Sequence, residues 1–320
     1  MAKTIGKIIN FVSPRLYQKI VLSKIEKRFK KVTDVEQEII NNYFKRFNYH
    51  LNLSSPKTFY EKMNYLKLYQ SDEKFSNYVD KISAKEIAQS MNSKIKISKT
   101  LFVFNNVISF KKELSKKTFP KECVIKMNHT SGDVFFYREN HFYDKYGSCI
   151  SKRKVFAILE YRLKLNYYHT NFERCYKPIQ PRIIVEEFFQ SLSGIPEYKF
   201  FCNYGVPKMV NVVYDRQAGS RVREAFTDEN LCIFPVHQDQ PLISQEDIFQ
   251  PKCWDEMLCF VKKVSKDFPF LRVDLMTDGT DFYFCEFTFY DFGGNAIFYP
   301  LEWDTKIGDL FDFSKIEKYS

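Results

Sequence analysis

The strongest constraint on the fold is a pair of apolar segments near the C terminus, residues 270–276 and 281–289. The turn Thr277-Asp278-Gly279-Thr280 separates them, and a short Gly-containing turn between two such segments is typical of a β-hairpin. Residues of equal parity share one face of a strand. Arg272 therefore lies on the same face as Asp274, and the chain is expected to end in an antiparallel ribbon that carries charge on that face.

The acidic residues Asp274 and Glu286 come from the two arms of this hairpin and are expected to lie side by side. Adjacent carboxylates repel each other, and burial increases that cost. A divalent cation removes the repulsion, and Mg²⁺ commonly collects two carboxylates together with nucleotide phosphates. Arg272 can neutralise the two acids instead. From the residues alone, a metal site and a salt bridge remain equally open.

The rest of the chain predicts helices first and antiparallel strands afterwards. Up to Pro120 the pattern is mainly helical, and Thr58 with Glu61 forms a capping box at one helix start. From Glu122 onward strands dominate. We expect helices at 33–47, 58–68, 72–91, 151–164 and 254–267, strands at 97–104, 124–127, 134–137, 182–189, 197–203 and 207–214, and irregular structure at 218–250. The fold class is therefore α+β with antiparallel sheets.

Most of the net charge of +10 belongs to the N-terminal segment 1–31, which has nine basic residues and one acid, Glu26. The remainder is close to neutral, which argues against a nucleic-acid-binding face on the main body. Apolar residues alternate with the bases in this segment. It therefore predicts either a basic amphipathic helix on an anionic membrane surface or a helix packed on the main domain.

Cellular location is constrained by what the chain lacks. No apolar run is long enough to cross a bilayer, and the start lacks the uninterrupted apolar region of a secretory signal. The eight cysteines are scattered without CxxC pairs, as expected for reduced thiols, and the five histidines do not group with them into a zinc site. We expect a cytoplasmic protein, with the N-terminal segment as a candidate peripheral contact with the inner face of the membrane.

Two lysines lie on predicted strands where an anion could meet them. Lys126 precedes the polar turn 128–133, whose backbone N–H groups could surround phosphates together with the ammonium. The turn is neither a Walker A nor a GxGxxG pattern, so by itself it also fits a plain exposed turn. Lys199 has aromatic neighbours in its strand, and a lysine there is costly unless an anion meets it. It also fits a lysine extending from an exposed sheet face.

The order of these features resembles the ATP-grasp superfamily, and most closely the TupA-like ATP-grasp family, named for teichuronopeptide biosynthesis. The resemblance covers 56–311 and is carried by the segments 56–62, 80–81, 125–132, 197–201, 272–275, 286–290 and 300–310. It implies two antiparallel-sheet lobes with ATP between them, preceded by a mainly helical region. The expected divisions are 1–32, 33–120, 121–189 (first lobe) and 190–314 (second lobe, with the metal site).

The resemblance also implies roles in ATP binding. Lys126 and Lys199 would contact the phosphates of ATP. Ser131 and Gly132 would lie in the loop that closes over those phosphates. The pair Glu186-Glu187 would end the linker strand, where backbone groups meet adenine and a carboxylate meets the ribose or the amino group.

Metal binding and catalysis are implied for the terminal hairpin. Asp274 and Glu286 would hold Mg²⁺, with Thr288 as a third ligand in the place where many ATP-grasp enzymes have Asn. Arg272, with Lys199, would stabilise the developing acyl phosphate and the oxyanion that follows it.

The implied activity is that of an ATP- and Mg²⁺-dependent carboxylate–amine ligase, joining an amino acid or another amine to a uronic acid of a cell-surface polysaccharide. Three alternatives stay open: a sugar or glycan kinase that uses the same ATP site, a glycosyltransferase of surface polysaccharide synthesis, and a non-catalytic binding protein. The sequence lacks the DxD motif of many glycosyltransferases, and its full set of site residues argues against a binding protein. His129 is a candidate base for the amine, although a structural role explains it more simply.

Overall fold

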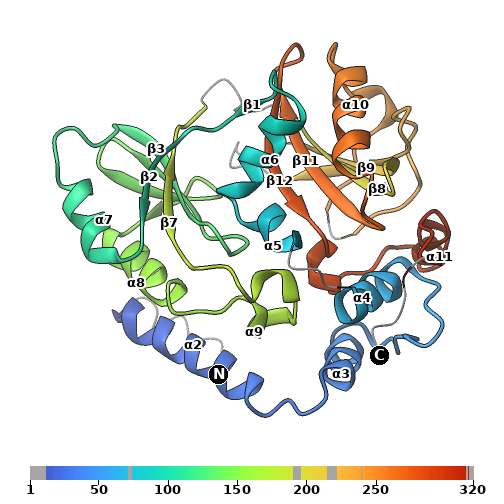
Figure 1. Ribbon diagram of the computed structural model, residues 1–320, viewed down its shortest axis with the longest axis horizontal. Helices are drawn as coiled ribbons and strands as arrows, with labels where there is room; N and C mark the ends of the chain where they lie inside the picture. Colours follow the sequence, from blue (N-terminus) through green and yellow to red (C-terminus); the bar gives the residue numbers. More distant parts are fainter. Residues whose placement is uncertain are drawn as a thin grey trace. The chain divides into compact units, whose positions relative to one another are not determined.

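The computed structural model describes residues 12–70, 74–189, 196–214, 222–238, 240–314 and 316. Over these residues the chain forms two compact units, each containing a six-stranded sheet (Figure 1). Unit 1 comprises Met1–Thr33, Ser98–Asn171 and Tyr176–Phe189, and unit 2 comprises Asp34–Ile97, Phe172–Cys175 and Gln190–Ser320. The chain therefore enters unit 1 first and returns to it after building the first helices of unit 2.

Unit 1 contains an antiparallel sheet with the strand order β2-β7-β3-β4-β5-β6. Its strands are β2 (Thr100–Phe104), β3 (Glu122–Met127), β4 (Val134–Arg138), β5 (His141–Asp144), β6 (Cys149–Ile150) and β7 (Ile183–Glu186). Its helices are α2 (Pro14–Phe29), α7 (Val107–Leu114), α8 (Lys152–Arg162) and α9 (Tyr168–Asn171). The 3₁₀ helix η1 (Arg174–Tyr176) follows α9 in the chain, and its first two residues belong to unit 2. The predicted hairpin of β3 and β4 is confirmed.

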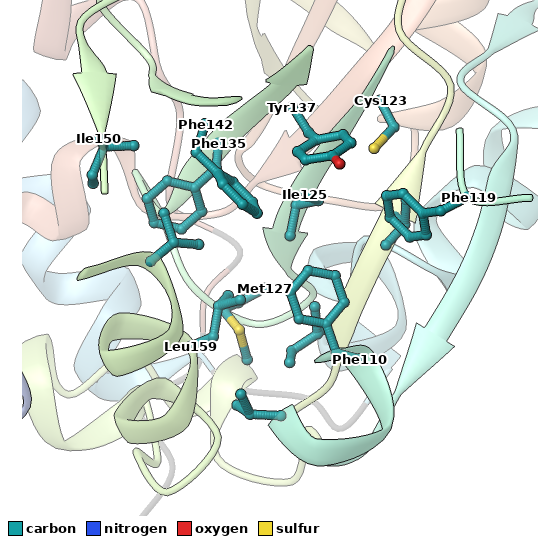
Figure 2. Packing of buried hydrophobic residues seen from close by; sticks show 14 residues of the cluster. Phe110, Phe119, Cys123, Ile125, Met127, Phe135, Tyr137, Phe142, Ile150 and Leu159 are labelled. Atoms are coloured by element: carbon teal, nitrogen blue, oxygen red, sulfur yellow. The ribbon is translucent and has the colours of Figure 1, made fainter. Parts of the chain in front are cut away.

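The core of unit 1 forms because alternate residues of its strands are apolar. Ile125 and Met127 of β3 point to one face, where Phe110 of α7 and Leu159 of α8 cover them (Figure 2). Burial of each such side chain contributes about 1.5–3 kcal/mol. On the same strand Lys126 lies between these residues, so its side chain leaves from the opposite face.

Helix α2 packs along α8 within unit 1 (Figure 1). Arg15 of α2 forms an ion pair with Glu160 of α8 at 2.7 Å, and the ring of Phe29 stacks on His169 with centroids 3.8 Å apart. Over 12–31 the segment thus follows the packed-helix alternative, whereas 1–11 lie outside the described residues. None of the described helices combines the length and apolarity that a membrane span requires.

Unit 2 contains a sheet with the strand order β1-β12-β11-β8-β9-β10, in which the pair of β1 and β12 is parallel and the other pairs are antiparallel. Its strands are β1 (Lys96–Ile97), β8 (Glu197–Asn203), β9 (Val206–Tyr214), β10 (Arg223–Thr227), β11 (Leu271–Thr277) and β12 (Phe282–Thr288). Its helices are α3 (Val35–Phe47), α4 (Phe59–Tyr69), α5 (Lys74–Val79), α6 (Ser83–Met91), α10 (Trp254–Val264) and α11 (Glu302–Asp309), with the 3₁₀ helices η3 (Gln245–Asp247) and η4 (Asp291–Gly294).

One expectation for this unit is wrong. The segment 218–250 was expected to be irregular, but β10 lies inside it and pairs with β9 over its whole length. The strand has five residues and begins with Arg223 and Glu224, so it lacks the run of apolar alternation by which a strand is recognised. The register with β9 places it in the sheet, and on its other side the backbone of Glu224 forms hydrogen bonds with Pro241 and Ile243.

The two faces of this sheet differ in polarity. On one face, the rings of Tyr198 and Phe200 pack against Trp254 of α10, with centroids 5.4 and 5.3 Å apart. Lys199, between them on β8, and Asp274 on β11 point to the other face, where burial continues but the side chains are charged. A buried, charged sheet face is the first indication of a functional site.

Candidate active site

A row of charged residues crosses three neighbouring strands of unit 2. Lys199 on β8 is the register partner of Asp274 on β11, which is in turn the partner of Glu286 on β12. Directly cross-strand side chains of antiparallel neighbours share a face. The same register places Thr288 opposite Arg272. The structure therefore brings together all five candidate residues of the β8 strand and the terminal hairpin.

Arg272 binds three carboxylates at once. Its Nε and Nη2 donate to Oδ1 and Oδ2 of Asp274, both at 2.7 Å, and Nη2 also donates to Oε1 of Glu286 at 3.0 Å. Nη1 donates to Oδ1 of Asp291 at 2.6 Å. A planar guanidinium with five donors suits this arrangement, which a lysine could not reproduce. The structure therefore contains the salt bridge between Arg272 and the two acids that the sequence left open.

The cluster nevertheless carries more negative than positive charge. Burial raises the pKa of Asp274 to about 7, against the opposing effect of Arg272 and Lys199. Burial also acts to lower the pKa of Arg272, but the carboxylates of Asp274 and Asp291 hold it well above its ordinary value. Arg272 thus stays charged, and the cost of the excess negative charge appears as the raised pKa of Asp274. An additional cation would allow all three carboxylates to ionise.

Lys199 is the second cation of this face, and its side chain is almost entirely enclosed. The residue is 8% exposed, and it forms no hydrogen bond or ion pair with any residue that the structure describes. It acts on Asp274 and Glu224 only through longer-range attraction. An enclosed ammonium without a paired anion is costly, and a phosphate group would supply the missing partner.

Asp291 reaches the cluster from η4, which follows β12 directly. The hydroxyl of Tyr60 on α4 donates to Oδ2 of Asp291 at 2.7 Å. The same helix holds the turn in place: Asn64 Nδ2 donates to the carbonyl of Gly294, and the buried Lys67 Nζ donates to that of Gly293. Tyr60, Asn64 and Lys67 follow one another at helical spacing, so a single face of α4 positions Asp291.

These contacts include residues to which the sequence assigned no function. Tyr60 belongs to the segment 56–62 and Asp291 directly follows the segment 286–290, but the family resemblance assigned neither a role. The sequence signal for Asp291 is its place five residues after Glu286, with the glycines Gly293 and Gly294 two and three residues further on. Of these, Gly294 lies at φ +76°, and a side chain there would meet Asn64 at 2.6 Å. The close approach of α4 explains why the turn needs glycine.

Unit 1 holds the other candidates for ATP binding. Lys126 Nζ forms an ion pair with Oε2 of Glu186 at 2.7 Å, on the sheet face opposite the core. Glu186 is buried, whereas the carboxylate of Glu187 is half-exposed. The backbone N–H of Glu187 donates to the carbonyl of Lys99. The strand end is therefore anchored, with one acid paired to the candidate phosphate-binding lysine.

The polar turn between β3 and β4 is fixed at its base and open at its tip. The backbone N–H of Arg182 donates to Oδ1 of Asn128 at 2.7 Å, and the hydroxyl of Thr130 donates to Oδ2 of Asp133 at 2.9 Å. Ser131 and Gly132 at the tip are exposed, and Gly132 has φ +84°, a conformation that favours glycine. Such a turn can present backbone N–H groups to an anion.

His129 does not behave as a base in this structure. It is buried, with Nδ1 3.2 Å from Oδ1 of Asn128 and Nε2 3.1 Å from the carbonyl of Leu165. Both ring nitrogens therefore contact protein atoms, as expected for a structural histidine.

The acids of unit 2 fit a magnesium ion that also binds a nucleotide. No group of three or more His, Cys, Asp or Glu side chains in the described part of the chain is arranged to hold a metal by itself. Asp274 and Glu286 offer hard oxygen ligands from paired strands. Mg²⁺ typically takes one or two protein carboxylates and completes its shell with phosphates and waters. Thr288, half-buried beside them, stays a prediction as the third ligand.

Solved structures with a similar fold include D-alanine–D-alanine ligase from Helicobacter pylori, with 14% identity and a TM-score of 0.39. The match covers 73% of this chain and 58% of the ligase. The macrocyclase MdnC from Microcystis aeruginosa MRC, bound with precursor peptide MdnA, has 13% identity and a TM-score of 0.36, over 75% of this chain and 62% of its own. The chain thus spans less than two thirds of either protein.

No curated protein sequence matches the chain. The model of one protein family, described as TupA-like ATPgrasp, matches residues 61–312. This range contains every candidate site residue, from Lys126 to Thr288, and spans most of the chain. The chain belongs to the TupA-like ATP-grasp family.

Proposed function

We propose that the protein is an ATP- and Mg²⁺-dependent carboxylate–amine ligase. The observation that carries the proposal is the row Lys199, Asp274 and Glu286 on neighbouring strands: an enclosed ammonium without a paired anion lies opposite a buried carboxyl group whose pKa burial raises to about 7, and a second carboxylate follows on β12. A triphosphate with its metal ion would complement both at once. The family to which the chain belongs supports the same nucleotide.

The proposed reaction begins with attack of a substrate carboxylate on the γ-phosphorus of ATP. Mg²⁺, held by Asp274 and Glu286, would spread the charge of the phosphates. Lys199 and Lys126 are proposed to bind phosphate oxygens, and the tip at Ser131 and Gly132 to cover them. Arg272 would stabilise the charge that develops on the acyl phosphate. Catalysis of this kind depends on positioning and charge rather than on a covalent enzyme intermediate.

For the acceptor, we propose a uronic acid of an anionic cell-surface polysaccharide, joined to an amino acid or another amine. The name of the family, which refers to teichuronopeptide-type synthesis, is the support for this substrate class. A cytoplasmic enzyme with its basic segment 1–31 near an anionic membrane would meet such a glycan during its synthesis.

A kinase that phosphorylates a sugar hydroxyl is the second candidate, because the same groups would bind ATP. The deciding experiment is a screen for ADP release with uronic acids and amino acids, alone and in pairs. We expect turnover only when a carboxylate and an amine are both present, with an amide as product. ADP release with a neutral sugar alone would favour the kinase.

The same screen tests the metal site. Asp274→Asn and Glu286→Gln should lower turnover by more than about 100-fold, since even outer-shell partners of a metal contribute about 10- to 100-fold. Asp255→Asn and Glu256→Gln, exposed acids of α10, serve as matched controls and should retain activity. Full activity in both site variants would show that the metal lies elsewhere.

A further inference from the structure

Unit 2 contains a small pocket that none of the roles above uses. It has a volume of about 130 Å³ and is lined in part by Arg46 of α3, by Glu224 of β10, and by Gln238 and Asn295. A water molecule occupies about 30 Å³ in the liquid, so this volume suits a group of a few heavy atoms. Its walls combine an acid, a base and side-chain amides with apolar side chains that include Phe47, Phe292 and Ile297, and a few polar groups in an apolar lining are typical of a site for a small ligand.

Glu224 is the most unusual residue of this pocket, because one of its oxygens is buried without a donor. The residue is 7% exposed, and Oε2 accepts a hydrogen bond from Nδ2 of Asn211 at 3.3 Å. Oε1 has no hydrogen-bond partner among the described residues. An acceptor left without a donor costs about 1–3 kcal/mol, so such groups call for an explanation. A ligand with N–H donors would supply one.

The pocket lies next to the catalytic cluster on the same sheet face. Asn211, which binds Glu224, is the register partner of Lys199. A second connection runs along the wall: Nε2 of Gln238 donates to the hydroxyl of Tyr60 at 2.6 Å, and Tyr60 donates to Asp291. The pocket and the Arg272 cluster are thus joined by continuous hydrogen bonds.

The acidic and the basic side chain of the pocket come from different elements, Glu224 from β10 and Arg46 from α3. Glu224 lies on the sheet, on the same face as Lys199, and the exposed guanidinium of Arg46 lies over the ring of Phe47, 5.1 Å from its centroid. A ligand with a positive end and a negative end would match both residues, with the positive end toward the cluster. Burial raises the pKa of the Glu224 carboxyl, which makes it a better proton acceptor than an exposed acid.

We propose that this pocket binds the amine substrate as an α-amino acid, and that Glu224 binds its ammonium group and removes a proton from it, while Arg46 binds its carboxylate. This inference rests on the proposed ligase function and names its amine. The neutral amine then forms the C–N bond with the acyl carbon, and the C–O bond to phosphate breaks. The electron pair leaves with inorganic phosphate, which takes the second N–H proton, and Glu224 returns its proton to solvent.

Hydroxylamine separates the two half-reactions, because it traps the acyl phosphate as a hydroxamate without an amine site. The amino acids to be used separately are glycine, L-alanine, L-serine, L-glutamate and L-lysine, with the carboxylate found in the screen. Glu224→Gln should lower kcat/KM for the amino acid by about 100-fold or more, the usual contribution of a general base, and leave ATP-dependent hydroxamate formation unchanged. Glu246→Gln, an exposed glutamate of η3, is the matched control.

Each other outcome overturns part of the account. Unchanged kcat/KM for the amino acid in Glu224→Gln would exclude Glu224 from the amine site. Loss of hydroxamate and amide together would place Glu224 in the ATP half-reaction or in folding, and would likewise overturn the inference. A wild-type enzyme that forms no hydroxamate would overturn the ligase proposal itself and the inference with it.

Arg46→Gln tests the class of amine independently. We expect its KM for the amino acid to rise by about 10-fold or more, as for loss of a charge-assisted hydrogen bond, with no change for the matching amino acid amide, which lacks the carboxylate. An equal change for both compounds, or none for either, would show that the ligand is not recognised through a carboxylate.

Discussion

At the scale of single residues, Arg272 and Lys199 are both buried cations but contribute differently. Arg272 compensates three acids, so its removal would leave them buried without a counter-charge. We expect Arg272→Gln to lower the free energy of unfolding by about 3–5 kcal/mol, as for other buried pairs that lose one partner. Urea denaturation measures this. Arg138→Gln, which removes an exposed pair with Glu122, should change it by less than about 1 kcal/mol.

Replacement of Lys199 should hardly change the free energy of unfolding, in contrast to replacement of Arg272, because no hydrogen bond or ion pair joins Lys199 to the residues that the structure describes. Lys199→Met should keep the free energy of unfolding within about 1 kcal/mol of wild type, since it removes a buried charge together with its desolvation cost. Affinity for MgATP should fall about 10- to 150-fold, the value of one charge-assisted hydrogen bond. Calorimetric titration with a non-hydrolysable ATP analogue measures the affinity. An unchanged affinity would contradict the phosphate role.

At the scale of elements, a substitution of Gly308 tests how closely α11 packs on the start of α4. A Cβ on Gly308 would lie 2.2 Å from the backbone carbonyl of Lys57. Alanine normally stabilises a helix by about 1 kcal/mol relative to glycine, but here we expect Gly308→Ala to destabilise by about 1–3 kcal/mol through overpacking. Thermal unfolding checks the sign. Lys306→Ala, on the exposed side of α11, should be nearly neutral.

The same helix should make stability depend on pH. Burial raises the pKa of Asp304 to about 7, with the nearby Glu61 adding to the effect. The folded state then binds more protons than the unfolded state between about pH 4 and pH 7, so stability falls as pH rises through this window. Asp304→Asn removes the effect, and should match wild type near pH 4 but exceed it by a few kcal/mol near pH 8, at about 1.4 kcal/mol per pKa unit. Urea unfolding at both pH values measures this, and parallel pH profiles would contradict it.

At the scale of the whole molecule, the sequence predicts those features that depend on neighbouring residues alone: strands, helix starts and the residues that share one face of a strand. Strands β8, β9, β11 and β12 lie in segments that the sequence predicts as strands, and the capping box of Thr58 and Glu61 marks the start of α4. The expectation that Asp274 and Glu286 lie side by side is confirmed, but their pairing also depends on a β-bulge between Asp274 and Leu275, without which Asp274 would lie opposite Cys285. Arg272 was correctly expected on the same face.

What the sequence did not predict depends on contacts between distant segments. Asp291 joins the cluster because α4, more than 200 residues earlier, holds its turn through Tyr60. Glu224 was missed because it lies on β10, an edge strand whose polar sequence gives no strand signal but which pairs with β9. The N-terminal segment allowed two interpretations, and contacts with distant residues, such as the ion pair of Arg15 with Glu160 and the stacking of Phe29 on His169, show how 12–31 pack. Pairing and packing of this kind cannot be seen in a local pattern.

The central claim is that a carboxylate of the substrate attacks ATP at the site of Lys199, Asp274 and Glu286. Labelling that carboxylate with ¹⁸O tests it most directly, with mass spectrometry of the inorganic phosphate released during amide formation. Passage through an acyl phosphate transfers one carboxylate oxygen to phosphate, so we predict one ¹⁸O in each phosphate formed. Phosphate that carries no label, or a phosphorylated sugar in its place, would contradict the account.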